Sequence, residues 1–425
     1  MKLLRLPNLV PMMLLLSFLP TALPAAETSQ RTEASQSPVQ KTDEAAFREA
    51  PYLNVRQGLK NSRTRFLQTK QGRVAFLGGS ITEMDGYRPM VCEMLKRRFP
   101  GTRFEFMNAG IASTCSTTGA FRMQRDVLGK GPVDLLLVEF AVNDQQDAAH
   151  TESECIRGME GILRQARRQN PNMDVVFLYF VNPFMMDQFR QGETPLPIRS
   201  HEKVAQHYGI PSLDLAREVT ARIDTGEFDW EKFGGVHPAP FGNAIYAHAV
   251  ERLMEACWKD EPAVNSPLKP YDLPKEPLDK WNYGDGILVW PEKTKTDAAW
   301  TRGTPDWKSL KGECRERFAR EELLCSTQPG AEAKLTFSGT AVGLYVLAGP
   351  DAGNVAYSID GAPFQTRDLY HEYSAGLHYP RTCMLETELS PGRHELTLRV
   401  SDRQNPKSSG HAVRILQFAV NGKGE

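Results

Sequence analysis

Three short polar motifs follow apolar segments of the chain and a fourth precedes its last predicted helix in the first half, and their residue types suit nucleophilic catalysis. Ser80 stands directly after a Gly-Gly pair at the end of an apolar run, and Gly110, Asn143 and His237 follow in later motifs. A serine nucleophile needs a base to take its proton and hydrogen-bond donors to hold the oxyanion that forms. Each residue alone has a structural alternative, as a helix cap, a turn glycine or a structural histidine. The four motifs together favour catalysis.

A parallel sheet would bring these motifs to one edge. In the first half of the sequence, short apolar runs alternate with helical patterns, which is typical of a parallel sheet covered by helices. Ligand sites of such sheets lie at the carboxyl ends of the strands, where the motifs are expected. We predict a small doubly wound α/β domain with strands at residues 73–78, 103–108, 133–140, 174–180 and 210–213.

The second half of the sequence changes to a period of two. Apolar residues alternate within 335–337, 342–346, 396–400 and 416–420, and Gly-Pro, Asp-Gly and Pro-Gly dipeptides separate the segments. This pattern predicts a smaller, all-β sandwich of antiparallel strands.

The N-terminal residues have the layout of an export signal. Lys2 and Arg5 precede an apolar stretch that small residues follow. The stretch is short for a bilayer span, and prolines interrupt it. We predict a signal peptide at residues 1–26, no stable membrane anchor, and a periplasmic or extracellular protein. The alternative is an uncleaved amphipathic anchor.

Two changes in composition divide the remaining chain. Residues 27–46 are polar without apolar periodicity, which predicts a flexible leader. Five prolines between 259 and 283 exclude regular helix and predict an extended linker. We therefore expect one domain at 47–258 and a second at 284–425.

Composition excludes several classes of protein. The chain has 425 residues, 40% hydrophobic and 24% charged, as in ordinary globular proteins. Its 51 basic and 52 acidic residues form no long block of one sign, which argues against a nucleic-acid partner. The seven cysteines contain no CxxC pair, so neither a disulfide scaffold nor a zinc motif is indicated. We predict no cofactor and no metal.

The four motifs resemble those of the SGNH (GDSL-like) hydrolase family. Ser80 in Gly-Gly-Ser-Ile-Thr matches the first family motif, and Gly110, Asn143 and His237 match the later ones, within residues 72–258. The resemblance implies a flavodoxin-like sheet and hydrolysis of acyl esters through an acyl-enzyme. It also implies that Ser80 is the nucleophile and His237 the base and later the acid. The oxyanion hole would be the backbone amides of Ser80 and Gly110 and the side-chain amide of Asn143.

The sequence departs from the family pattern at the orienting acid. Most members carry an aspartate three residues before the histidine, where this chain has Gly234. Asp229 is a candidate replacement and Glu231 lies nearby. A backbone carbonyl could instead accept the histidine N–H, which would leave a Ser80–His237 dyad.

Other side chains suggest additional roles. Glu139, at the end of a predicted buried strand, is expected to form a structural ion pair with Arg88 or Arg122. In the second half, 368–373 and 378–381 are rich in aromatic residues with polar groups, which suit either stacking on sugar rings or packing within the sandwich.

The predicted function is an exported carbohydrate O-acetylesterase that acts on an acylated glycan or another small ester. A lipase or lysophospholipase is an alternative, because residues 182–198 contain Phe184, Met185, Met186 and Phe189 and could form an apolar flap. A carbohydrate acetyltransferase would use the same acyl-enzyme. A non-catalytic glycan-binding protein with a decayed hydrolase domain is a further alternative, suggested only by Gly234.

Overall fold

The computed structural model describes residues 52–259 and 266–424. The predicted signal peptide and leader lie outside these residues, so export stays a prediction. The predicted domain limits also stay predictions. Within the described ranges the chain forms an α/β part around one sheet and a β part around another, and contacts join the two into one compact unit.

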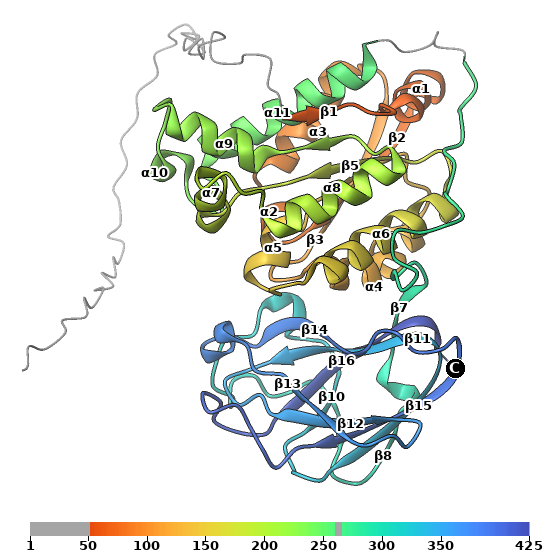
Figure 1. Cartoon of the computed structure of the whole chain (residues 1–425), viewed down its shortest axis with the longest axis vertical. Helices are drawn as coiled ribbons and strands as arrows, with labels where there is room; N and C mark the ends of the chain where they lie inside the picture. The colour runs from red at the N-terminus through yellow and green to blue at the C-terminus, as the bar shows by residue number, and fades with distance from the viewer. Residues whose placement is uncertain (1–51, 260–265, 425) are drawn as a thin grey trace, which may run out of the picture. The chain divides into compact units, whose positions relative to one another are not determined.

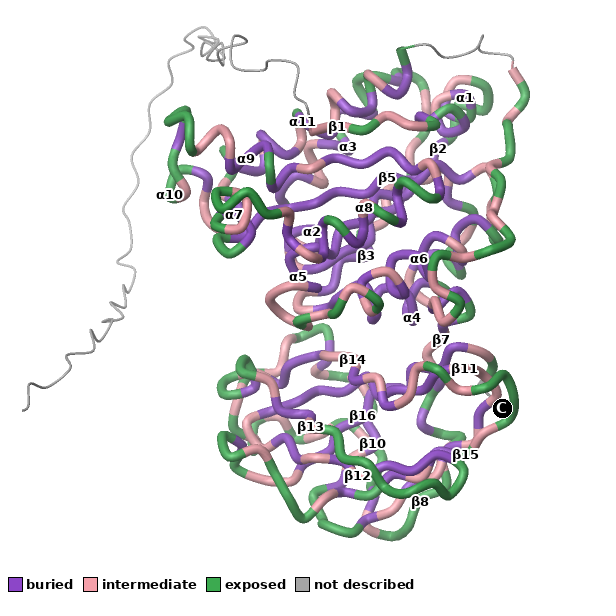
Figure 2. Tube along the Cα trace, in the orientation of Figure 1, coloured by how far each residue is buried: buried purple, intermediate pink, exposed green. Residues whose placement is uncertain are grey.

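Sheet A has the strand order β1-β6-β5-β4-β2-β3. Strands β2 to β6 are parallel, in the order of a flavodoxin-like sheet, and β1 pairs with β6 in the antiparallel direction. The central strands are buried apolar runs (Figure 2), which is why their sequences do not alternate. The strands are β1 (Leu53–Asn54), β2 (Gln71–Gly78), β3 (Arg103–Gly110), β4 (Leu135–Val138), β5 (Asp174–Leu178) and β6 (Ser212–Leu213). The predicted doubly wound fold is confirmed.

Helices cover both faces of sheet A (Figure 1). Helices α1, α3 and α11 lie on one side, and α4, α6 and α8 lie on the other. The helices are α1 (Lys60–Thr69), α2 (Ser80–Glu83), α3 (Tyr87–Arg98), α4 (Ser116–Asp126), α5 (Ala141–Gln146), α6 (Glu152–Gln169), α7 (Pro183–Arg190), α8 (Leu196–Tyr208), α9 (Leu215–Asp224), α10 (Trp230–Phe233) and α11 (Pro240–Trp258).

Sheet B contains the remaining strands, whose ladders are antiparallel. The strands are β7 (Gly286–Val289), β8 (Lys295–Thr296), β9 (Thr301–Gly303), β10 (Leu323–Ser326), β11 (Glu332–Ala348), β12 (Asn354–Ile359), β13 (Gln365–Asp368), β14 (Tyr379–Glu386), β15 (Gly392–Val400) and β16 (Val413–Gly424). The second half is therefore sandwich-like, as predicted.

One long strand serves both layers of sheet B. The alternating segments 335–337 and 342–346, which suggested two strands, both belong to the 17-residue β11. Its first half pairs with β15 and its second half with β14. The register shifts where the two halves meet, as at a β-bulge, so the strand can change layers without a turn.

The described part of the proline-rich segment, 266–283, contains no helix or strand and is bound to the α/β part. Lys269 exchanges hydrogen bonds with Asn61, and the Tyr271 hydroxyl donates to Asp174 at 2.5 Å. Prolines exclude regular structure here as expected. The hydrogen bonds fix the path of the segment.

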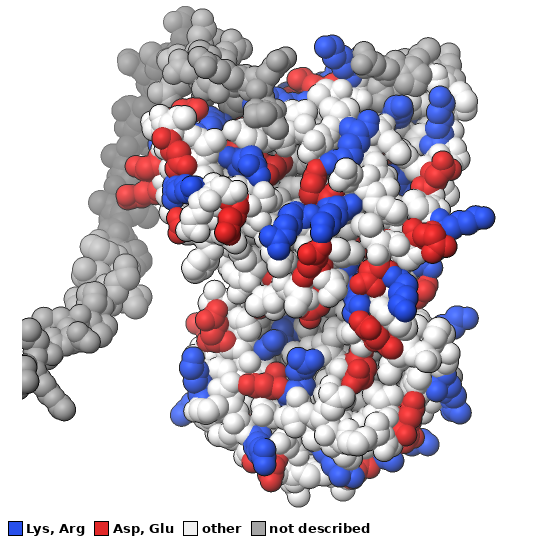
Figure 3. Space-filling view, viewed as in Figure 1, with Lys and Arg blue, Asp and Glu red and all other residues white. Residues whose placement is uncertain are grey.

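The charge on one face of the molecule and the hydropathy of the described helices bear on its partners. On the face drawn in Figure 3, basic and acidic side chains lie among one another over both parts. Among the helices of the described ranges, none combines the length and hydropathy that a bilayer-spanning segment needs.

Candidate active site

Ser80 is the first residue of α2, at the carboxyl edge of sheet A. It follows β2, whose neighbours β3 and β4 come later in the sequence and lie on its two sides, so Ser80 stands at a topological switch point. A Cβ on Gly79 would collide with the side-chain amide of Asn143. The glycine therefore lets Asn143 of α5 lie directly against the serine turn.

His237 reaches Ser80 from the loop between α10 and α11. Its Nε2 lies 2.7 Å from Ser80 Oγ, although the two are 157 residues apart in sequence. The loop is held by Asn243, a buried residue of α11 whose amide donates to the Pro238 carbonyl at 2.5 Å. Nε2 can accept the serine proton only when it carries no proton itself, so in the neutral imidazole the ring proton must be on Nδ1. This is the geometry of a nucleophile and its base.

The loop before His237 explains why no acid stands three residues earlier. Gly234 ends α10 with a left-handed φ of 100°, and a Cβ there would collide with the backbone of Ala239. An aspartate at this position would therefore be strained. Asp229 has a different role, because its carboxylate accepts the Lys232 amide at 2.7 Å and caps α10. Within the described ranges no carboxylate is hydrogen-bonded to His237, which favours the dyad.

Substitution of Asp229 tests the dyad. We expect Asp229→Asn to change kcat/KM by less than about threefold, because asparagine caps helices as well as aspartate does. Glu231→Gln, on the exposed side of α10, is the matched control and should behave in the same way. The measurement is kcat/KM against pH on a short acyl ester. A loss of several orders of magnitude in either variant, with the fold intact, would instead indicate a triad with a displaced acid.

Asn143 presents its side-chain amide beside the serine turn. Its Nδ2 donates one hydrogen to Asp147 Oδ2 at 2.6 Å. Among the described residues, the second amide hydrogen has no protein partner. Asn143 is 4% exposed, so this donor points from a fixed, largely desolvated position. The arrangement suits a group that stabilises an oxyanion.

Gly110 lies at the end of β3 and brings that strand close to α2. A Cβ on Gly110 would collide with the backbone of Glu83. The Gly110 amide donates to Asn108 Oδ1 at 2.9 Å, so this N–H already has an acceptor. Gly110 thus lets the end of β3 pack closely against the backbone of α2 beside the site. Its part in the oxyanion hole stays a prediction.

Glu139 is buried beneath the serine turn. Its Oε1 accepts the Gly79 amide and the Thr82 hydroxyl, each at 2.8 Å. Burial raises the pKa of Glu139 to about 8, against the lowering effect of these hydrogen bonds. The predicted ion pair with Arg88 or Arg122 is wrong, because the carboxyl group faces the serine turn and both guanidinium groups donate elsewhere.

Two arginines of the β part hold the loops of the site. Arg317 donates to Glu83 Oε1 at 2.7 Å and to the Gly110 carbonyl at 3.3 Å. Arg315 donates to Ser113 Oγ at 2.9 Å. The sequence analysis missed both arginines, because nothing in their local sequence relates them to motifs 200 residues away.

Asp147 joins the α/β part to the aromatic residues of the β part. The Tyr379 hydroxyl donates a hydrogen bond to Asp147 Oδ1 at 2.8 Å. His371 Nε2 is hydrogen-bonded to the backbone carbonyl oxygen of Asp147, also at 2.8 Å. Burial raises the pKa of Asp147 above its ordinary value. The sequence analysis missed Asp147, although its spacing of four residues from Asn143 places the two on one face of a helix.

The sequence between the serine and the histidine also identifies the family. Residues 76–245 match the sequence profile of the GDSL-like Lipase/Acylhydrolase family. This part of the chain is a GDSL-like lipase/acylhydrolase domain. The match includes Ser80, Gly110, Asn143 and His237, and it makes the GDSL-like domain a carboxylic ester hydrolase.

The GDSL-like domain and the sheet that follows it share their fold with a solved two-domain esterase active on acetylated mannans. Two crystal structures of that esterase, one with mannopentaose, match with a TM-score of 0.68 and 19% sequence identity. The matches cover 88% of this chain and 97% and 98% of the esterase chains. At this identity the likeness shows a shared fold. No curated protein matches the chain.

Two groups of possible metal ligands in the GDSL-like domain share Asp144. The groups are Cys115–Asp144–His150 and Asp144–Cys155–His201. The Asp144 carboxylate already accepts hydrogen bonds from the backbone and a hydroxyl of α4, and His201 Nε2 lies 2.8 Å from it. Burial raises the pKa of Asp144, but its histidine partners outweigh burial and hold that pKa below the ordinary range. The cluster acts as a hydrogen-bond network among α4, α5 and α8.

The predicted apolar flap does not form in the GDSL-like domain. Met185 and Met186 of α7 are buried in the core of the α/β part, and Phe189 packs under the Arg217 guanidinium. Phe184 alone is largely exposed, at 69%. The apolar residues of this segment are therefore used mainly in packing.

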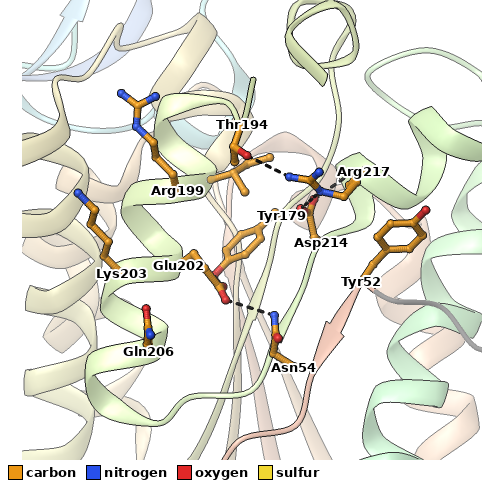
Figure 4. Close-up of a pocket in the computed structure, with 11 residues that line it drawn as sticks. Tyr52, Asn54, Tyr179, Thr194, Arg199, Glu202, Lys203, Gln206, Asp214 and Arg217 are labelled. Carbon is orange, nitrogen blue, oxygen red and sulfur yellow. Dashed lines mark hydrogen bonds and ion pairs between the residues drawn. The ribbon is translucent and has the colours of Figure 1, made fainter. Parts of the chain in front are cut away.

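A cavity of about 470 Å³ lies at the β1–β6 edge of the GDSL-like domain (Figure 4). Its walls carry charged side chains from α8 and α9, including Arg199, Glu202 and Arg217. Several are bonded to one another or to neighbours, as Arg217 is to Thr194. None of the four motif residues lines this cavity, so it is separate from the candidate active site.

Proposed function

We propose that this protein is an exported serine esterase that removes acetyl groups from carbohydrate through an acyl-enzyme. The observation that carries the reaction is the 2.7 Å contact between His237 Nε2 and Ser80 Oγ at the carboxyl edge of the sheet. No acidic side chain is hydrogen-bonded to the imidazole among the described residues, which supports a Ser80–His237 dyad as the proposed catalytic unit.

The proposed reaction has two halves. His237 takes the proton of Ser80 as its oxygen attacks the ester carbonyl, and the Asn143 amide and the Ser80 backbone amide donate to the oxyanion. The intermediate collapses as the bond between the acyl carbon and the sugar oxygen breaks and His237 gives the proton to that oxygen; the sugar leaves with a free hydroxyl, and an acetyl-serine remains. Water then attacks the acetyl-serine as His237 takes a proton from the water. The second intermediate collapses when His237 gives that proton to Ser80 Oγ, which frees the serine and releases acetic acid.

The surroundings of the site support a polar substrate. The rings of His371 and Tyr379 stack at 4.4 Å, and Tyr373 beside them is 45% exposed. A cavity of about 230 Å³ with mostly polar walls, which include Arg381, lies beside Asp147 and Tyr379. None of the four motif residues lines it, and Asp147, which accepts a hydrogen bond from Asn143, connects it to the candidate site. An aromatic face next to polar groups suits a sugar ring. The esterase that shares both parts of the fold is active on acetylated mannans, which is consistent with this proposal.

A substrate panel tests the acyl group and its carrier together. Acetate release from acetylated mannan and xylan is compared with hydrolysis of p-nitrophenyl acetate and p-nitrophenyl palmitate. We expect acetate release from an acetylated glycan and, because no apolar flap covers the site, a kcat/KM for palmitate at least about tenfold below that for acetate. A preference for palmitate would favour the lipase alternative. Acetylated product formed with a sugar acceptor in place of water would favour the transferase.

A further inference from the structure

We infer that Tyr379, on β14 of the β part, is a positioning residue for ester hydrolysis that holds the Asn143 amide through the carboxylate of Asp147. The inference rests on the proposed role of Asn143 as a donor to the oxyanion. Tyr379 itself does not contact Asn143 and is not proposed to touch the reacting atoms.

A continuous chain of hydrogen bonds connects the three side chains. The Tyr379 hydroxyl donates to Asp147 Oδ1 at 2.8 Å, and Asn143 Nδ2 donates to Asp147 Oδ2 at 2.6 Å. Each carboxylate oxygen thus receives one of the two donors. The Asp147 amide also donates to the Asn143 carbonyl at 3.0 Å, at the end of α5. Asp147 is therefore the link between β14 and Asn143 of α5.

The carboxylate determines which way the Asn143 amide faces. An ionised carboxylate only accepts hydrogen bonds, so the NH₂ group of Asn143 must face Asp147. The Oδ1 atom then lies against Gly79, where a Cβ would collide with it. If the amide turned over, two oxygens would face each other and the donor would be lost to the oxyanion. A fixed Asp147 carboxylate thus keeps the second N–H of the Asn143 amide free to donate to the oxyanion, in one direction.

Tyr379 is well placed to fix that carboxylate. It is 2% exposed and pairs with Ala348 in the β11–β14 ladder. Its ring stacks on His371 with an angle of 4° between the planes. His371 Nδ1 accepts the Tyr373 amide, so Nε2 carries the ring proton and donates to the Asp147 carbonyl at 2.8 Å. The two rings hold Asp147 by its side chain and by its backbone.

The first test separates positioning from substrate contact. On p-nitrophenyl acetate, Tyr379→Phe should lower kcat by about tenfold and change KM by less than about twofold. The reason is that the misplaced Asn143 amide loses a hydrogen bond that forms only in the transition state. Tyr345→Phe is the matched control, since it removes a buried hydroxyl from the same β11–β14 ladder, and within the described residues that hydroxyl has no hydrogen bond. It should keep the wild-type kcat. An unchanged kcat in Tyr379→Phe, or a raised KM alone, would overturn the inference.

The second test asks whether Tyr379 acts through Asn143. In an Asn143→Ala background, Tyr379→Phe should cause almost no further loss of kcat, because the group that it positions is gone. A full tenfold loss in that background would show an independent effect and overturn the inference. An Asn143→Ala variant with wild-type kcat would overturn it as well. The ester contains no sugar, so failure on acetylated glycans would reject the proposed substrate and leave this test intact.

A third measurement needs no substrate. Chemical unfolding of Tyr379→Phe, Asp147→Asn and the double variant gives the coupling between the two side chains. If the hydrogen bond exists, the double variant should lose less stability than the sum of the single variants. Additive losses would overturn the link even if the enzyme proved inactive on every ester tried.

Discussion

Replacement of Ser80 by alanine is expected to reduce ester hydrolysis by at least about 10⁴-fold, because in the proposed mechanism the hydroxyl oxygen is the atom that attacks the ester. The side chain is small and only partly buried, so thermal unfolding should be unchanged. The measurement is the initial rate on p-nitrophenyl acetate, corrected for spontaneous hydrolysis, together with a melting curve.

A matched serine and a chemical probe complete the Ser80 experiment. Ser153→Ala alters an exposed serine of α6 and should retain full activity. A fluorophosphonate should add to Ser80 in the wild type and to no residue in Ser80→Ala, as read by peptide mass spectrometry. Turnover that survives in Ser80→Ala, in a protein with the wild-type melting temperature, would reject the serine mechanism.

The second large effect is expected at Asn143. A donor aimed at the oxyanion contributes about 3 kcal/mol mainly in the transition state, so Asn143→Ala should lower kcat by about 10²-fold with a nearly constant KM. Gln145→Ala, on the same helix and bonded to Gln188, is the control for damage to α5 and should leave kcat unchanged. A raised KM with wild-type kcat would make Asn143 a substrate contact instead.

The sequence predicted the parts of the fold that have strong local patterns. The central strands β4 and β5 of sheet A are almost entirely apolar, and five of the six strands of the sheet were expected at nearly their observed positions. β1 was missed because it has two residues and carries no period. β11 was divided because Gly339 and Thr340 interrupt its apolar alternation, and sequence periodicity cannot show that a strand continues through a bulge.

The candidate site was predictable where a residue's role follows from its own motif. Ser80, Asn143 and His237 lie together as expected, and each follows an apolar strand or precedes a helix. The hydrogen bonds of Glu139 and Asp147 were not predictable, since they depend on which neighbours the packing brings within reach. The path of the Gly234 loop was equally hidden, because glycine permits many conformations and only packing against Ala239 selects one.

The contacts of Arg315, Arg317 and Tyr379 with the catalytic loops have an evolutionary consequence. A side chain in the β part can change without loss only if its acceptor in the GDSL-like domain changes with it, as Arg317 with Glu83 or Tyr379 with Asp147. Among homologues, these pairs should therefore covary although more than 200 residues separate them. Recombination that joins this GDSL-like domain to another β part would break the pairs, so we expect the two parts to be inherited together.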